Sequence, residues 1–275
     1  MDEFKLAVCQ NKVVDNKDEN IETAVNMVRS AAENHSQIVV LPEMFNCPYD
    51  NLKFIEYAEK RSNSKTLQNI REVAKDCGIY VIAGSIPEIL GEKIYNSSFT
   101  FNSNGDIVAI HRKLHLFDID IPGSITFRES DTLSAGDKIT VFECEYGKIG
   151  VAICYDIRFP EIFGLMTLEG VNLIVVPGAF NMKTGPAHWE VLIRARAVDN
   201  QVYLAAASPA TNENLSYVAY GNSMVVNPWG DVIARAGSGE EIIYADIKLS
   251  ELEKVRNELP VLKNRRNDIY DVVLK

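Results

Sequence analysis

The sequence lacks any long hydrophobic run. Hydrophobic residues make up 47% of its 275 positions, yet no apolar stretch approaches the ~18 residues that a membrane-spanning helix needs. The N-terminal MDEFKLAVCQ also lacks the basic region, apolar stretch and small-residue cleavage site of a secretory signal. We therefore predict a protein without a membrane span, located in the cytoplasm.

The sequence also lacks the cysteine and histidine patterns that build disulfide frameworks and metal sites. Its five cysteines are an odd number, and they include no CxxC pair. His111 and His115 are four residues apart, but the residues before them predict a strand, and no HExxH motif or third ligand accompanies them. We predict neither a metal nor a cofactor, and we interpret both histidines as structural or surface residues.

Positive charge is scarce. The chain has 28 Lys and Arg against 38 Asp and Glu, a formal net charge of −10. Binding to a phosphate backbone relies on clustered basic residues, which here are scattered, so we expect no nucleic-acid partner. No linker, low-complexity tract or internal repeat divides the chain, which predicts a single domain over residues 1–275.

What the sequence does contain is an alternation of strand and helix patterns. The first part of the chain predicts strands at 4–10, 38–41 and 80–83 and helices at 17–34, 51–60 and 64–76. A β-hairpin with an Asn-Gly turn follows over residues 94–113. The second part predicts two strands joined by a turn at 145–148, further strands at 171–176, 202–207, 223–227 and 231–234, and a helix at 187–200. The fold class is therefore α/β.

Cys154 stands where an apolar run meets a polar segment, in IGVAICYDIRFPE (149–161). Residues 151–153 predict the end of a buried strand, and 160–170 predict a short helix that a glycine ends. A thiol near a helix N-terminus is expected to favour the thiolate, which is the nucleophilic form. The alternative is that Cys154 is only a small buried apolar residue.

Two further reactive side chains stand at the ends of predicted strands. Glu43 follows the apolar run Ile38–Leu41, and Lys113 ends the hairpin. Taken alone, Glu43 is typical of an exposed capping carboxylate and Lys113 of a solvated surface charge. Glu129 lies in the turn-rich segment 116–138, which we interpret as a long structured loop of the kind that carries functional groups.

In an α/β sheet the strand ends form the crevice where ligands bind, so Glu43, Lys113 and Cys154 are expected to meet there. A thiolate can attack a carbonyl or nitrile carbon, a carboxylate can move the proton, and an ammonium can stabilise the oxyanion. A papain-like hydrolase would need a histidine partner for Cys154, but none of the four histidines (His35, His111, His115, His188) stands in a recognisable context.

The segments VVLPEMF, HRKLHLF and GVAICYDIRFPE resemble the three catalytic motifs of the nitrilase, or carbon–nitrogen hydrolase, superfamily. RARAVDNQVYLAAAS, GNSMVVNPWGDVIA and LPVLKNRRNDIY are similar too, so the resemblance covers essentially the whole chain. It implies a four-layer α-β-β-α sandwich that dimerises into an eight-layer assembly, and we expect a homodimer or a larger even homo-oligomer. It also implies roles for five residues: Glu43 as base and acid, Lys113 as stabiliser of the intermediate, Cys154 as nucleophile, Glu129 as a second glutamate and the Tyr155 backbone N–H as oxyanion donor.

Within that superfamily the ω-amidase branch is most similar, through FNCPYDNLKFIEYAE and KLHLFDIDIPGSITFRES, although Asp50 stands where relatives often carry glycine. The resemblance implies hydrolysis of the terminal amide of small dicarboxylic acid mono-amides such as 2-oxoglutaramate. Tyr49, Arg158 and Lys113 are candidates to hold the substrate carboxylate, whereas Arg158 can instead pair with Glu161. The open alternatives are another amidase, a nitrilase, an N-carbamoyl hydrolase, or a non-catalytic binding protein of the same fold.

Overall fold

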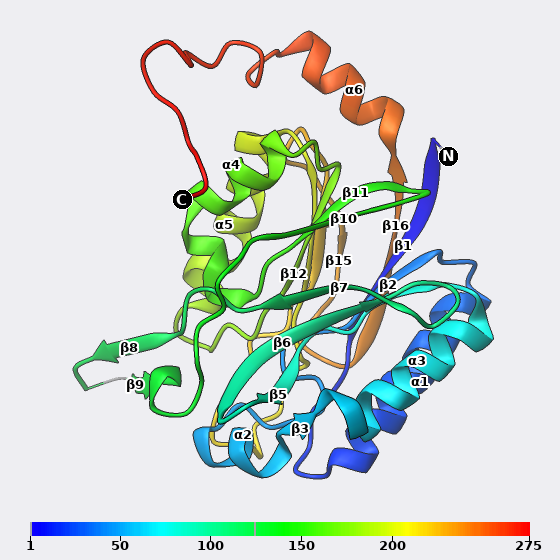
Figure 1. Cartoon of the computed structure of the whole chain (residues 1–275), viewed down its shortest axis with the longest axis vertical. Helices are drawn as coiled ribbons and strands as arrows, with labels where there is room; N and C mark the ends of the chain where they lie inside the picture. Colours follow the sequence, from blue (N-terminus) through cyan, green and yellow to red (C-terminus); the bar gives the residue numbers. More distant parts are fainter. Residues whose placement is uncertain (1, 124) are drawn as a thin grey trace.

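The computed structural model describes residues 2–123 and 125–275. Two β-sheets lie face to face in it, each covered on its outer side by helices (Figure 1). The first sheet has eight strands in the order β16-β1-β2-β4-β6-β5-β3, with β7 paired to β6, and the second has six strands in the order β10-β11-β12-β13-β14-β15. This arrangement confirms the predicted α/β fold with α-β-β-α layers.

The first sheet is built mainly from the N-terminal part of the chain. Its central strands β1, β2 and β4 are parallel, and β16 pairs antiparallel with β1. The strands are β1 (Glu3–Gln10), β2 (Ile38–Val40), β3 (Glu59–Lys60), β4 (Tyr80–Ile82), β5 (Ile86–Leu90), β6 (Lys93–Phe101), β7 (Ile107–Arg112) and β16 (Glu241–Lys248). The helices of this part are α1 (Lys17–Glu33), α2 (Asn51–Tyr57) and α3 (Lys65–Cys77).

The second sheet carries the C-terminal half. Its strands are β10 (Thr140–Cys144), β11 (Gly147–Val151), β12 (Leu173–Pro177), β13 (Tyr203–Ala207), β14 (Met224–Val226) and β15 (Val232–Arg235). The helices α4 (Pro160–Leu168) and α5 (Gly185–Asn200) cover its outer face, and α6 (Leu249–Glu258) follows β16. A separate two-stranded hairpin, β8 (Asp118–Ile121) and β9 (Ile125–Arg128), stands out from the body in Figure 1.

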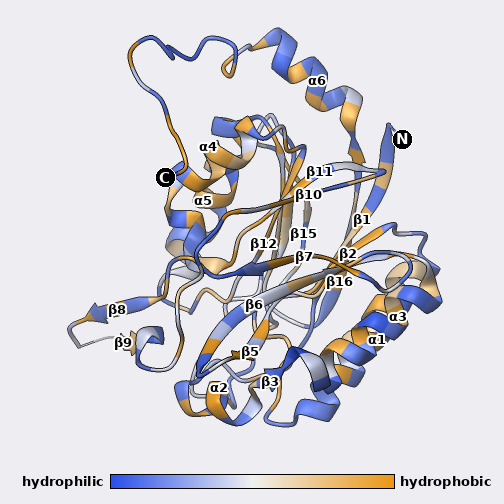
Figure 2. Ribbon diagram, viewed as in Figure 1, coloured by the Kyte–Doolittle hydropathy of each residue, from blue (hydrophilic) through white to orange (hydrophobic). Residues whose placement is uncertain are grey.

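The alternation of side chains along each strand explains the layers. In β1, Leu6 and Val8 enter the core between the two sheets, whereas Ala7 and Cys9 face the helices α1 and α3. In β12, Val175 faces the core between the sheets and Ile174 faces α4 and α5. Figure 2 shows the hydrophobic residues concentrated along the strands and on the inner sides of these helices.

Several predicted boundaries were wrong. The helix expected at 51–60 ends at Tyr57, because Glu59–Lys60 forms the short edge strand β3 beside β5. The segment 116–138 contains the β8–β9 hairpin rather than loop alone. The strands β5 and β16 and helix α6 were not predicted, although β16 has a visible signal in the alternate burial of Ile243, Ala245 and Ile247.

The chain ends on the second helix layer. After α6 it runs back towards α4 and α5 (Figure 1), where Val261 and Tyr270 share a groove with Leu168 of α4 and Asn200 of α5. No helix in the described part of the chain is long and apolar enough to cross a membrane.

Candidate active site

Cys154 is presented by a sharp turn at the end of β11. The strand ends at Val151, and a single 3-10 turn, η3 (Cys154–Arg158), begins at the cysteine before Pro160 opens α4. The backbone φ of Cys154 is +48°, a left-handed conformation that costs a non-glycine residue roughly 1–3 kcal/mol and is concentrated at functional sites. Gly178 makes room for the turn, because a Cβ there would lie 3.3 Å from the Cys154 Cα.

The predicted thiolate character of Cys154 was wrong. Burial raises the pKa of the Cys154 thiol well above its usual value, and the negative charge of Glu43 raises it further. The turn that begins at Cys154 is only five residues long, and its dipole does not offset complete removal from water. Cys154 is therefore a neutral thiol that needs a base before it can act as a nucleophile.

Glu43 is the carboxylate beside that thiol. It follows β2 and is fully buried, so the exposed cap that its position alone suggests is not what the fold builds. Its Oε1 accepts hydrogen bonds from the Lys113 Nζ at 2.9 Å and the Asn96 Nδ2 at 2.8 Å, and its Oε2 accepts one from the Ala179 backbone N–H at 2.8 Å. Burial raises the pKa of Glu43, with Lys113 opposing the shift and Glu129 adding to it.

Lys113 lies at the centre of the cluster. It follows β7 and is fully buried, so the solvated surface charge that its type alone suggests is wrong. Its Nζ lies 2.9 Å from Glu43 Oε1, 2.9 Å from Glu129 Oε1 and 3.2 Å from the Tyr49 hydroxyl. Burial works to lower the pKa of Lys113, but Glu129 and Glu43 outweigh it and hold the pKa above its usual value, so the side chain is an ammonium.

Glu129 is brought to Lys113 by the β8–β9 hairpin. It is fully buried at the point where β9 ends. Its Oε1 accepts the Tyr49 hydroxyl at 2.5 Å besides Lys113, and its Oε2 accepts the Phe117 backbone N–H at 2.6 Å. Because the single hydroxyl hydrogen of Tyr49 is directed at Glu129, that hydroxyl is not a free donor for a substrate.

Arg158 lies on the other side of the thiol. A cavity of about 10 Å³ is lined by Cys154, Tyr155 and Arg158 together with Phe180 and Tyr217. The pairing of Arg158 with Glu161 is not found. Its Nη1 lies 3.3 Å from His188 Nδ1, its guanidinium lies over the Phe180 ring at 5.0 Å, and its buried Nε has no hydrogen-bond partner among the described residues.

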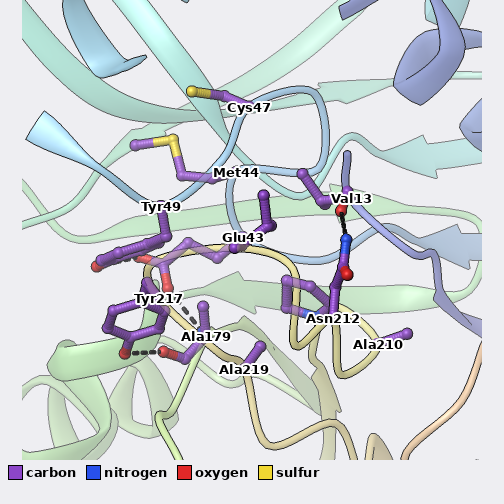
Figure 3. Close-up of a pocket in the computed structure, with 12 residues that line it drawn as sticks. Val13, Glu43, Met44, Cys47, Tyr49, Ala179, Ala210, Asn212, Tyr217 and Ala219 are labelled. Carbon is purple, nitrogen blue, oxygen red and sulfur yellow. Dashed lines mark hydrogen bonds between the residues drawn. The ribbon is translucent and has the colours of Figure 1, made fainter. Parts of the chain in front are cut away.

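Three contributors to the site were missed by sequence reasoning: Asn96, the Ala179 backbone and Tyr217. Ala179 donates its N–H to Glu43, and its carbonyl oxygen accepts the Tyr217 hydroxyl at 2.5 Å (Figure 3). Glu43, Tyr49 and Tyr217 also line a cavity of about 20 Å³, drawn in Figure 3. Asn96 and Tyr217 are far from the motifs in sequence, and Ala179 contributes only backbone, so only the buried position of Asn96 within a strand could have drawn attention.

His111 and His115 share one carboxylate: His111 Nε2 lies 3.2 Å from Asp156 Oδ2, and His115 Nδ1 lies 2.8 Å from Asp156 Oδ1. No group of three or more potential metal ligands occurs in the part of the chain that the structure describes. The predicted structural role of the histidines is confirmed, although His111 is buried.

The fold has two stacked sheets between helix layers, and it brings a buried thiol, lysine and carboxylate together at strand ends. This combination defines a class of protein: hydrolases that cleave carbon–nitrogen bonds without a histidine base. A family model described as carbon-nitrogen hydrolase matches residues 5–257, and the chain belongs to this family.

The relatives agree with this family. The chain is 54% identical to the ω-amidase NIT2 of Danio rerio over 99% of this chain and 98% of that protein. It is 50% identical to the ω-amidase NIT2 of Homo sapiens over 100% and 99% of the two chains. The crystal structure of Saccharomyces cerevisiae Nit3, a member of branch 10 of the nitrilase superfamily, matches with a TM-score of 0.89 and 41% identity over 96% of this chain and 97% of that one. The predicted superfamily and its ω-amidase branch are confirmed.

Proposed function

We propose that the protein is an ω-amidase that hydrolyses the terminal amide of small dicarboxylic acid mono-amides, such as 2-oxoglutaramate, and releases ammonia. Identity above 50% to an ω-amidase over nearly the whole chain supports this substrate class. The observation that carries the mechanism is the Lys113 ammonium, 2.9 Å from both Glu43 and Glu129, in the same buried cluster as a thiol whose pKa is raised by burial and by Glu43.

The first half of the reaction forms a thioester. Glu43 takes the proton of the Cys154 thiol, and the sulfur attacks the amide carbon. The oxyanion is stabilised by the Lys113 ammonium and by the Tyr155 backbone N–H at the start of the turn. Glu43 then gives its proton to the amide nitrogen, so that the C–N bond breaks and ammonia leaves while the acyl group stays on the sulfur.

The second half is hydrolysis of the thioester. Glu43, ionised again, takes a proton from water as the water oxygen attacks the thioester carbon. Collapse of this second oxyanion breaks the C–S bond, and Glu43 returns its proton to the sulfur. The acid product keeps the other proton of the water, loses it to solvent and leaves as a carboxylate. Glu129 acts through Lys113 and Tyr49, because its Oε1 binds both groups and fixes the direction of the ammonium.

Arg158 is the donor that we assign to the distant carboxylate of the substrate. Its unpartnered Nε and its place in the cavity beside Cys154 support this assignment. Tyr49, whose hydroxyl hydrogen is already directed at Glu129, contacts the substrate as part of the pocket wall. Tyr155 contributes its backbone N–H.

The substrate class is tested by the rate of ammonia release. We expect kcat/KM to be highest for 2-oxoglutaramate or succinamate, lower for butyramide, and negligible for a simple nitrile or an N-carbamoyl amino acid. Preference for butyramide would contradict the ω-amidase function and leave a general amidase, and preference for the nitrile would indicate a nitrilase.

We also propose a homodimer that forms through the helix layer of the second sheet. Large hydrophobic side chains are exposed there on α4, on α5 and in the C-terminal segment: Leu168, Val191, Val198, Val261 and Tyr270. Sedimentation at micromolar concentration tests this, and a stable monomer would contradict it.

The single domain over residues 1–275 is consistent with the family match to 5–257. The cytoplasmic location agrees with the five cysteines being free, and cell fractionation would test it.

A further inference from the structure

Asp156 is a third fully buried carboxylate, close in sequence to the thiol, and the mechanism above uses only the other two, Glu43 and Glu129. It lies in the turn η3, two residues after Cys154. Its Oδ2 accepts the Ile153 backbone N–H at 3.0 Å and faces His111 Nε2 at 3.2 Å. Its Oδ1 accepts the His115 backbone N–H at 2.9 Å and faces His115 Nδ1 at 2.8 Å. A carboxylate only accepts, so both ring nitrogens carry their hydrogen towards it.

The partners of Asp156 have a pattern in the sequence. His111 and His115 stand two residues before and two residues after Lys113, and Ile153 directly precedes Cys154. The Lys113 segment leaves β7 of the first sheet, whereas the Cys154 turn leaves β11 of the second. The carboxylate of Asp156 therefore joins the two segments that carry the ammonium and the thiol, across the boundary between the sheets.

The Cys154 turn needs such a restraint. Its first residue has a φ of +48°, and a strained backbone persists only where its surroundings over-determine it. The bond from the Ile153 N–H to Asp156 closes the turn around the cysteine, in the way an N3 carboxylate closes a capping box. On the other side, the His115 ring stacks on Phe159, with centroids 3.6 Å apart and planes 9° apart, which fixes the ring that bonds Asp156.

Asp156 is ionised, which is the state that a fixed hydrogen-bond acceptor requires. Burial works to raise the pKa of Asp156, but the hydrogen bonds from His111, His115 and Ile153 outweigh it and hold the pKa well below its usual range. The side chain is therefore an ionised acceptor at neutral pH, and it has no proton to exchange there.

We propose that Asp156 is a positioning residue for this reaction: its four hydrogen bonds fix the place of the Cys154 sulfur relative to the Lys113 ammonium and the Glu43 carboxylate. This proposal rests on the proposed function only in the experiments that measure turnover. The rate at which iodoacetamide alkylates Cys154 tests it without that assumption.

The experiment compares Asp156→Asn with a matched control, Glu88→Gln. Glu88 is also a buried carboxylate with strong partners, since it accepts Arg112 Nε at 2.7 Å and Ser97 Oγ at 2.7 Å, but it does not bond the Cys154 turn. Each variant is measured for its melting temperature, for its content of alkylatable Cys154, and for kcat per alkylatable site with 2-oxoglutaramate or succinamate.

We expect Asp156→Asn to lower both kcat per site and the alkylation rate by about 10- to 100-fold, because displacement of a reacting group by an ångström has effects of this size. In Glu88→Gln both rates should stay within about threefold of the wild type, whatever the loss of stability. A role in stability alone would lower the melting temperature and the number of alkylatable sites, but it would leave the rates per site unchanged, and that result would overturn the proposal.

A second variant covers the case in which Asp156→Asn does not fold. His115→Phe keeps an aromatic ring for stacking on Phe159 but removes the Nδ1 hydrogen bond, so we expect a loss of about 3- to 10-fold in both rates. Wild-type rates in this variant would also overturn the proposal. If the wild-type protein releases no ammonia from these amides, the proposed function fails, whereas the alkylation rates still decide the role of Asp156.

Discussion

Glu43 and Asp156 are both fully buried carboxylates, and each bonds Lys113 or the segments that carry Lys113 and Cys154, yet their pKa values move in opposite directions. Asp156 receives four hydrogen bonds and has no anion among these partners. Glu43 must share the Lys113 ammonium with Glu129. The comparison teaches that the balance of charge and donors around a buried acid, rather than burial itself, decides whether the acid can exchange a proton or serve as a fixed anchor.

The largest effect is expected at the Cys154 sulfur. Cys154→Ala should abolish turnover, because no thioester can form, while the fold persists since a small side chain fits the turn. Ammonia release and circular dichroism check this. More than a trace of the wild-type rate would remove Cys154 from the mechanism.

The next effect is expected at Glu43, the proposed base and acid, and at Lys113. Glu43→Gln and Lys113→Ala should each reduce kcat by on the order of a hundredfold or more, because each removes a proton-transfer or oxyanion group. Glu129→Gln should also be strongly impaired. Near-normal kcat in either of the first two variants would show that its assigned role is wrong.

Thermal unfolding of the same variants sharpens the comparison. Glu43→Gln removes one of two negative charges that compete for one buried ammonium, so its melting temperature should equal or exceed that of the wild type. Asp156→Asn leaves buried donors without an acceptor and should melt roughly 4–10 °C lower. An equal drop in melting temperature in both variants would contradict the difference between Glu43 and Asp156.

Acid titration separates the two acids in the wild-type protein. Glu43 must be ionised to accept the thiol proton, and its pKa is raised, so kcat/KM should fall on the acid side above the ordinary glutamate value of 4.5. Asp156 has a lowered pKa, so its contribution to stability is complete above the ordinary aspartate value of 3.8 and is lost as the pH falls below it. Activity should therefore disappear at a higher pH than the fold. Simultaneous loss of both would contradict this.

The smallest effect concerns Arg158, which we propose as the donor to the substrate carboxylate. Arg158→Ala should raise KM for 2-oxoglutaramate by about 10- to 100-fold, because a charge-assisted hydrogen bond is lost, and should leave butyramide nearly unaffected. Tyr49→Phe is the contrasting variant. It removes the hydroxyl bonded to Glu129, so both substrates should lose kcat alike. An equal effect of Arg158→Ala on both substrates would indicate that Arg158 does not bind the carboxylate.

Much of the fold could be predicted because its signals are local. Apolar periodicity indicated α1, α3 and the central strands, and Gly78 marked the end of α3 in the left-handed conformation that it adopts. The missed strand β5 is short. It pairs antiparallel with β6, the first strand of the predicted hairpin. The short β3 was read as helix because its pairing partner lies outside the segment.

The candidate site could be predicted only in part. The predicted strand ends placed Glu43, Lys113 and Cys154 together. Whether each side chain is buried depends on how the sheets and helices stack, which no local sequence pattern describes. The thiolate expectation failed for this reason, since a helix start is visible in sequence and desolvation is not. The histidine partners of Arg158 and Asp156 lie 30 or more positions away in the sequence, and sequence reasoning had no access to these contacts.

The charge count of the Glu43–Lys113–Glu129 cluster has a consequence for product release. Two carboxylates and one ammonium give −1 − 1 + 1 = −1 once Glu43 is ionised again. Hydrolysis of a mono-amide converts an uncharged amide end into a second carboxylate, formed against this negative cluster, where like charges within a few ångströms repel strongly at low dielectric. The dicarboxylate should therefore leave readily and inhibit weakly, so that turnover slows little as the product accumulates.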